Sequence, residues 1–127
     1  MRILLADDHE TVRMGVRAAL AQESQFDICG EAENGQDAVA KVRQLNPDAV
    51  ILDVSMPVMN GLEAAREIRR IAPSTKIVMF SMHDSAQMSE AAKQAGADAF
   101  VLKSAPGRQL VHAIHDVLLR KENGNKS

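Results

Sequence analysis

Short apolar segments alternate with amphipathic segments along the chain, and the alternation occurs five times. Most of the short segments are continuously apolar, which is typical of strands in a parallel sheet covered by helices on both faces. The predicted strands are 2–6, 27–32, 49–52, 76–80 and 99–102. The segment 27–32 alternates instead. Its pattern places Ile28, Gly30 and Ala32 on one side and favours an edge strand.

The segments between the strands repeat apolar residues at helical spacing, which predicts five helices. The apolar stripes are Val12, Val16, Ala19 and Leu20; Ala38, Val42 and Leu45; Leu62, Ala65 and Ile68; Met88, Ala91, Ala92 and Ala95; and Leu110, Ile114, Val117 and Leu118. Asn60 and Glu63 predict a capping box before the third stripe, and Gly96 predicts the end of the fourth helix. Pro47 and Pro73 close the second and third helical patterns.

Five strand–helix units in succession predict an α/β domain, a doubly wound (βα)5 parallel sheet. Right-handed crossovers leave few topologies for five strands. The flavodoxin-like strand order 2-1-3-4-5 is the natural one.

Composition limits the function classes. The 127 residues, 46% hydrophobic and 25% charged, suit one globular domain. A net charge of −2 gives no basic field for nucleic acid or an anionic membrane. The apolar segments are too short for a signal peptide or a membrane span. The single cysteine, Cys29, excludes an intrachain disulfide and fits a reducing compartment. We therefore expect a cytoplasmic protein with no membrane partner.

Polar residues follow four of the predicted strands, at the sheet edge where such folds bind ligands. Asp7 and Asp8 follow the first strand, Asp53 ends the third, Ser81 follows the fourth and Lys103 follows the fifth. Each one alone is commonly a helix cap, a turn residue or a solvated side chain. Together they predict a Mg²⁺ site on the three aspartates, with Lys103 opposite to neutralise a phosphoryl group. Asp53 is then the expected nucleophile, and Ser81 can donate to a phosphoryl oxygen.

Three other protein classes share part of this pattern. A haloacid-dehalogenase-type phosphatase needs its nucleophile after the first strand in a D-x-D arrangement, whereas Asp7 and Asp8 are adjacent. A flavodoxin-type electron carrier needs a hydroxyl- and glycine-rich phosphate loop there and usually aromatic flavin walls, but the chain has no Trp or Tyr. An interaction module that is never phosphorylated remains open, although it typically lacks one of the acidic or lysine positions.

The motifs "LLADDHE", "PDAVILDVSMPVMNGLEA", "IVMFSMHD" and "GADAFVLKSA", in this order, resemble the receiver domains of bacterial two-component response regulators. The likeness covers about residues 2–121 and is greatest to the NarL/LuxR-type branch. It implies that Asp53 is the phosphoacceptor. It also implies that Asp7, Asp8, Asp53 and the backbone carbonyl of Ser55 hold Mg²⁺.

The same resemblance implies a switch. Ser81 matches the switch hydroxyl, Lys103 the lysine of the motif, and Phe100 an aromatic that turns inward in the family. A plain core role for Phe100 is equally open. Family members often carry proline after the lysine, with a cis peptide between them. Here Ser104 follows Lys103, and a cis bond before a non-proline residue costs about 3–4 kcal/mol, so the geometry of this peptide is open.

The resemblance further implies a signalling phosphoacceptor rather than a turnover enzyme, with only self-phosphotransfer and autodephosphorylation. A sensor histidine kinase would donate the phosphoryl group, and phosphorylation can produce a homodimer. DNA contact and transcription regulation would come through a C-terminal output domain that residues 1–127 do not contain. We expect residues 1–121 to form the receiver, and 122–127 a flexible tail or the start of a linker. A stand-alone receiver is the alternative.

Two expectations concern the first helix. Arg13 and Arg17 lie beside its apolar stripe, and we expect this face to dock the kinase. His9 follows the acidic pair and is expected only to begin the helix.

Overall fold

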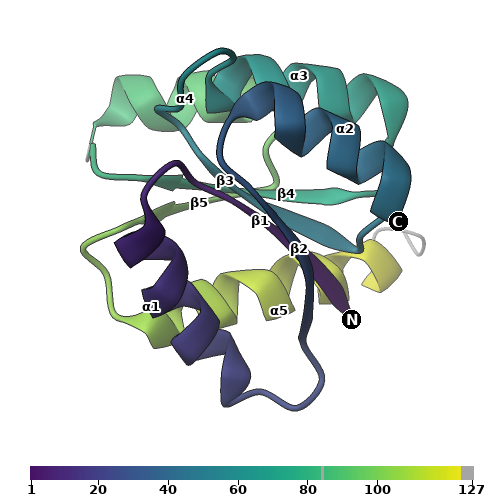
Figure 1. Ribbon diagram of the computed structural model, residues 1–127, viewed down its shortest axis with the longest axis vertical. Helices are drawn as coiled ribbons and strands as arrows, with labels where there is room; N and C mark the ends of the chain where they lie inside the picture. The colour runs from purple at the N-terminus through teal and green to yellow at the C-terminus, as the bar shows by residue number, and fades with distance from the viewer. Residues whose placement is uncertain (84, 124–127) are drawn as a thin grey trace.

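In the computed structural model, which describes residues 1–83 and 85–123, five strands alternate with five helices (Figure 1). The elements in chain order are β1 (Arg2–Ala6), α1 (Glu10–Ala21), β2 (Asp27–Ala32), α2 (Gly35–Leu45), β3 (Ala49–Asp53), α3 (Gly61–Ile71), β4 (Lys76–Ser81), α4 (Ala86–Gln94), β5 (Ala99–Leu102) and α5 (Gly107–Asn123). The predicted elements are all present. β3 and β4 each extend one residue further than predicted, so Asp53 and Ser81 are the last residues of strands.

The strands form one parallel sheet in the order β2-β1-β3-β4-β5, which confirms the flavodoxin-like prediction. The central strand β3 is buried along its whole length, as its continuous apolar run predicts. β2 is an edge strand, but its three alternate residues do not share one side of the sheet. The pairing with β1 shifts at Cys29, between Ile28 and Gly30, so Ile28 packs into one core and Ala32 into the other.

Helices cover both faces of the sheet, and each face has its own apolar core. α1 and α5 lie on one face, and α2, α3 and α4 lie on the other (Figure 1). Alternate residues of β1 enter different cores: Ile3 and Leu5 pack toward α1 and α5, whereas Leu4 and Ala6 pack toward α2 and α3. The sheet is thus fixed between two helical layers, and its carboxyl edge stays open for a site.

Helix boundaries largely follow the predicted signals. Asn60 and Glu63 form the capping box of α3, and Gly96 follows α4 with a φ of 103°. α1 begins after His9, whose side chain makes no capping hydrogen bond. Because His9 and not Asp8 occupies the N-cap position, the Asp8 carboxylate is available to the site.

α5 continues to Asn123, into the predicted tail of 122–127, and residues 124–127 lie outside the described part of the chain. The boundary at residue 121 thus stays a prediction. Among the described residues, no helix has the length and apolar character that a membrane crossing requires. The peptide between Lys103 and Ser104 is trans, as are the other peptide bonds of the described residues.

Candidate functional site

The predicted site residues meet at the carboxyl edge of the sheet. Asp7 follows β1, Asp53 ends the neighbouring β3, and Ser81 ends β4. Lys103 follows β5, and its backbone N–H donates to the Ser81 carbonyl over 2.7 Å. Adjacent parallel strands therefore bring together side chains that are far apart in sequence.

Lys103 bridges two of the carboxylates. Its Nζ lies 2.8 Å from Asp7 Oδ2 and 3.0 Å from Asp53 Oδ1. The Lys103 side chain is only 9% exposed, and the two carboxylates are more deeply buried. The ammonium also lies 5.8 Å from the centroid of the Phe80 ring. The lysine is thus held at the site although the peptide between Lys103 and Ser104 is trans.

Burial and like charge shape the protonation of this group. Burial is the main cause that raises the pKa of Asp53 to about 6, the Asp7 charge adds to it, and the hydrogen bond from Lys103 opposes both. Burial lowers the pKa of Lys103, but hydrogen bonds to Asp7 and Asp53 outweigh this and raise it overall. With Asp8 nearby, three carboxylates face one ammonium, so the site has excess negative charge.

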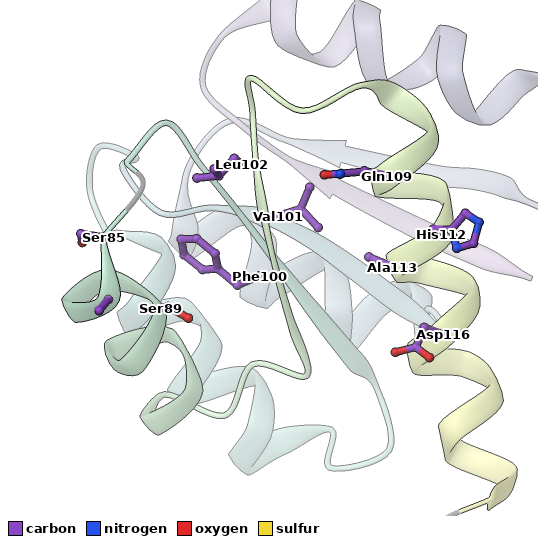
Figure 2. A pocket seen from close by; sticks show the side chains of 10 residues that line it. Ser85, Ser89, Phe100, Val101, Leu102, Gln109, His112, Ala113 and Asp116 are labelled. Atoms are coloured by element: carbon purple, nitrogen blue, oxygen red, sulfur yellow. The ribbon is translucent and has the colours of Figure 1, made fainter.

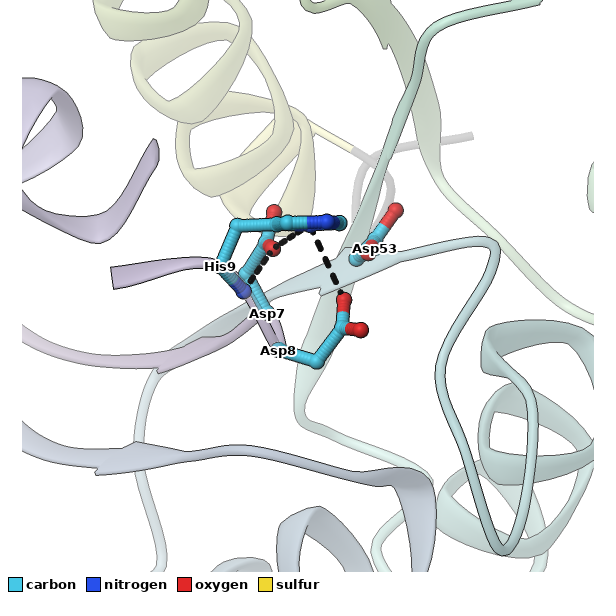
Figure 3. A group of neighbouring side chains, drawn as sticks. All are labelled: Asp7, Asp8, His9 and Asp53. Atoms are coloured by element: carbon cyan, nitrogen blue, oxygen red, sulfur yellow. Dashed lines mark hydrogen bonds and ion pairs between the residues drawn. The ribbon is translucent and has the colours of Figure 1, made fainter. Parts of the chain in front are cut away.

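The donor set suits a hard divalent cation. Asp7, Asp8, His9 and Asp53 each offer one ligand atom, and these atoms lie within 4.8 Å of one another (Figure 3). Asp53 is 3% exposed, yet its Oδ2 has no hydrogen-bond partner among the described residues. A buried polar atom left unpaired is costly unless a ligand satisfies it. Carboxylate oxygens are the ligands that Mg²⁺ takes, so the residues fit that ion.

Ser55 lies in the loop after β3, where its backbone N–H donates to Asp53 Oδ1 over 3.3 Å. Lys103 and Ser55 therefore share one oxygen of Asp53 and orient the carboxylate. The contact involves the nitrogen of Ser55, so the metal-binding role of its carbonyl stays a prediction.

The two predicted switch residues differ in their surroundings. Ser81 is buried, and its Oγ accepts a hydrogen bond from the backbone N–H of His83 over 3.0 Å. Phe100 is half-buried and packs against the core on the α3 and α4 side. It also lines a groove between α4, β5 and α5, near Ser89 (Figure 2). Phe100 thus borders both the core and the surface.

Arg13 is not part of an exposed docking face, contrary to the sequence-based expectation. Its side chain is 8% exposed and donates to the Asp7 carbonyl over 2.6 Å, to Glu31 over 3.0 Å and to Glu10 over 2.7 Å. Arg17 also pairs with Glu31. The spacing of apolar residues did not predict that Arg13 is buried. Arg13 lies one residue beyond Val12, on the side of α1 that faces β2. Arg13 anchors the loop that carries the acidic pair.

Replacing Arg13 with methionine is expected to lower the free energy of unfolding by about 2 kcal/mol, because the buried Asp7 carbonyl loses its partner. Urea unfolding without Mg²⁺ measures this. Arg17→Met is the matched control, and its half-exposed ion pair should cost less than about 1 kcal/mol. Equal losses in the two variants would contradict an anchoring role for Arg13.

Gly61 is a second residue whose role the sequence pattern did not show. Its backbone N–H donates to the Val54 carbonyl over 2.8 Å, and a Cβ there would lie 2.1 Å from the Asp53 carbonyl oxygen. Only glycine lets the start of α3 approach the Asp53 backbone this closely. The capping box of Asn60 and Glu63 predicted the start of the helix, but not the contact of Gly61 with Asp53.

A five-stranded flavodoxin-like sheet with buried aspartates and a lysine at its carboxyl edge defines a receiver-type domain. The chain belongs to the response regulator receiver domain family, whose model matches residues 3–115.

Particular relatives agree with this assignment. The chain is 33% identical over 114 residues to the transcriptional regulatory protein DegU of Brevibacillus brevis, covering 90% of this chain and 48% of that protein. It is 32% identical over 127 residues to the response regulator protein VraR of Staphylococcus saprophyticus, covering 100% of this chain and 58% of that protein. The chain thus spans about half the length of these relatives.

Solved structures give the same result. The receiver domain of the putative response regulator NarL from Mycobacterium tuberculosis is 32% identical, with a TM-score of 0.88 over 92% of this chain and 94% of that one. A LuxR-family two-component response regulator from an Aurantimonas species is 35% identical, with a TM-score of 0.89 over 93% of this chain and 84% of that one. The resemblance to the NarL/LuxR-type branch is thereby confirmed.

Proposed function

We propose that the chain accepts a phosphoryl group on Asp53 from a phosphorylated histidine of a sensor kinase. The proposal is supported by the buried Asp53 carboxylate, of which one oxygen is held by Lys103 and Ser55 and the other has no hydrogen-bond partner among residues 1–83 and 85–123. A carboxylate oxygen of Asp53 attacks phosphorus, the bond from phosphorus to the donor nitrogen breaks, and the donor imidazole keeps the electron pair. The product is an acyl phosphate.

Asp7, Asp8, Asp53 and the Ser55 carbonyl would hold Mg²⁺, which supplies positive charge to the transferring oxygens. Lys103 supplies a second positive charge, because its ammonium contacts both Asp7 and Asp53, and it orients the Asp53 carboxylate. Arg13 fixes the backbone of Asp7. The residues therefore act mainly by position and charge, as phosphoryl transfer requires.

Ser81 links phosphorylation to the loop after β4. Its hydroxyl accepts from the His83 amide, and donation to a phosphoryl oxygen would draw it away from that amide. Loss of this bond would free the backbone of His83 just after β4, and Phe100 lines the same groove as Ser85 and Ala86 at the start of α4. The switch is then a shift between two packings of this face.

Ser81→Ala tests the switch. The amide resonance of His83 should move when the wild type binds the phosphoryl analogue beryllofluoride with Mg²⁺. In the variant most of this change should be lost, because the hydrogen bond to Ser81 is already absent. Equal changes in the wild type and in Ser81→Ala would contradict the role of the hydroxyl.

The relatives suggest the wider context. DegU is a transcriptional regulatory protein, and we propose that this chain likewise controls an output, either a C-terminal DNA-binding domain or a partner protein. The chain would work in the cytoplasm as a signalling phosphoacceptor whose only chemistry is its own phosphorylation and dephosphorylation. Phosphorylation would favour a homodimer.

Two measurements separate a receiver from an interaction module and from a phosphatase. The first is thermal unfolding at increasing Mg²⁺ concentration, and the second is an assay for turnover of a phosphate ester. The proposal predicts a rise in the unfolding midpoint with Mg²⁺, because binding to the native state stabilises it. No response would favour an interaction module that is never phosphorylated. Steady turnover of a phosphate ester would favour a phosphatase. Either of these results would contradict the proposal.

A further inference from the structure

His9 follows the acidic pair directly, and its imidazole faces the carboxylates (Figure 3). Its Nδ1 lies 3.1 Å from Asp8 Oδ1 and 3.4 Å from Asp7 Oδ1. The backbone N–H of His9 donates to Asp7 Oδ1 over 2.9 Å, while the ring makes no capping bond to α1. The ring is therefore directed toward the cation site rather than toward the helix it precedes.

The same set of atoms can surround one ion. One atom from each of Asp7, Asp8, His9 and Asp53 lies within 4.8 Å of the others. The buried Asp53 Oδ2, which has no hydrogen-bond partner in the part of the chain that the structure describes, independently indicates a ligand at this position. The His9 side chain is 63% exposed, so the ring can rotate onto an ion without disturbing either core.

The chemistry of an added imidazole is selective. Mg²⁺ is a hard cation that prefers oxygen ligands and retains its waters, so it gains little from a nitrogen donor. Imidazole suits later divalent metals such as Co²⁺, Ni²⁺ and Zn²⁺. An all-oxygen site therefore treats Mg²⁺ and Co²⁺ differently from a site that adds one imidazole.

We propose that His9 is a metal ligand that raises the affinity of this site for Co²⁺-like cations relative to Mg²⁺. The proposal rests on the proposed function, which places a divalent cation among Asp7, Asp8 and Asp53. His9 is then a residue that determines metal selectivity, in addition to beginning α1.

Isothermal titration of the metal-free full chain with Co²⁺ and, separately, with Mg²⁺ tests this proposal. His9→Ala should weaken Co²⁺ binding by at least about tenfold, because loss of even an outer-shell group weakens metal binding by about 10–100-fold and a direct ligand should contribute no less. Mg²⁺ binding should change far less. The visible absorption of bound Co²⁺ should also move to longer wavelength, because an oxygen ligand replaces nitrogen.

His112→Ala is the matched control, since His112 lines the groove of Figure 2 on α5 and is not one of the four residues whose ligand atoms gather at the cation site. It should leave the affinities for both cations unchanged. An equal loss for Co²⁺ and Mg²⁺ in His9→Ala would overturn the proposal, because the ring would then only support the carboxylates. Unchanged Co²⁺ binding and absorption would overturn it as well. A wild type that binds neither cation would instead contradict the proposed function, and the role of His9 with it.

Discussion

Replacing Asp53 with asparagine is expected to stabilise the metal-free protein while removing its capacity for phosphorylation. The folded state holds a buried carboxylate whose pKa lies at about 6, whereas an unfolded aspartate has a value near 3.9. Ionising Asp53 at neutral pH therefore costs folding free energy. The amide has a similar shape without the charge, so the free energy of unfolding at pH 7.5 should rise by about 1–3 kcal/mol.

The pH dependence of this difference has a definite sign. Below about pH 4 Asp53 is protonated in both states, so its charge costs nothing. As the pH rises from about 4 through 6, ionisation of Asp53 lowers the free energy of unfolding of the wild type, whereas the variant has no such loss. The advantage of Asp53→Asn should grow across this window and level off above it. Urea unfolding at several pH values without Mg²⁺ measures the curve.

Asp27→Asn is the matched control, because Asp27 is exposed at the start of β2. Its effect should stay within about 0.5 kcal/mol, as for most surface substitutions. A variant at Asp53 that is less stable than the wild type at every pH would contradict the view that the site has excess negative charge.

Replacing Lys103 with methionine should have the opposite effect on stability. The ammonium is the shared partner of Asp7 and Asp53, and methionine has similar bulk but no charge. The expected loss is about 3 kcal/mol, the low end for removal of one partner from a buried pair, since Asp53 can take up a proton. Phosphorylation by a small donor should also slow strongly, because one of the two positive charges facing the phosphoryl group is gone.

Mg²⁺ should recover part of the stability lost in Lys103→Met, because the ion supplies positive charge to the same carboxylates. Lys93→Met provides the control, with an exposed lysine in the last turn of α4. It should change unfolding by less than about 0.5 kcal/mol. If Lys103→Met were no less stable than Lys93→Met, the buried bridge would have no energetic role.

The fold could be predicted because its signals are local and periodic. Continuous apolar runs identified the buried strands, and polar residues at their ends identified the open edge of the sheet. The prediction that alternate residues of β2 share one side of the sheet was wrong. The register shift at Cys29 lets Ile28 and Ala32 face different cores. Such an irregularity depends on pairing with β1, and the pattern of a single strand does not contain it.

The site was predicted in part for the same reason. Parallel topology necessarily brings Asp7, Asp53 and Lys103 to one edge once the strand order is known. The buried position of Arg13 depends instead on Glu31 of the neighbouring strand and on a backbone carbonyl, and neither contact has a signal in the spacing of residues along α1. Hydrogen bonds from a side chain of one element to the backbone of another segment, such as that from Arg13 to Asp7, could therefore be identified only in the structure.

Phosphorylation of Asp53 is tested by the intact mass of the protein after incubation with acetyl phosphate, with and without Mg²⁺, in the wild type and in Asp53→Asn. We expect a single phosphoryl adduct on the wild type with Mg²⁺, and no adduct without the ion or in the variant. An adduct that persisted in Asp53→Asn, or no adduct on the wild type under either condition, would contradict it.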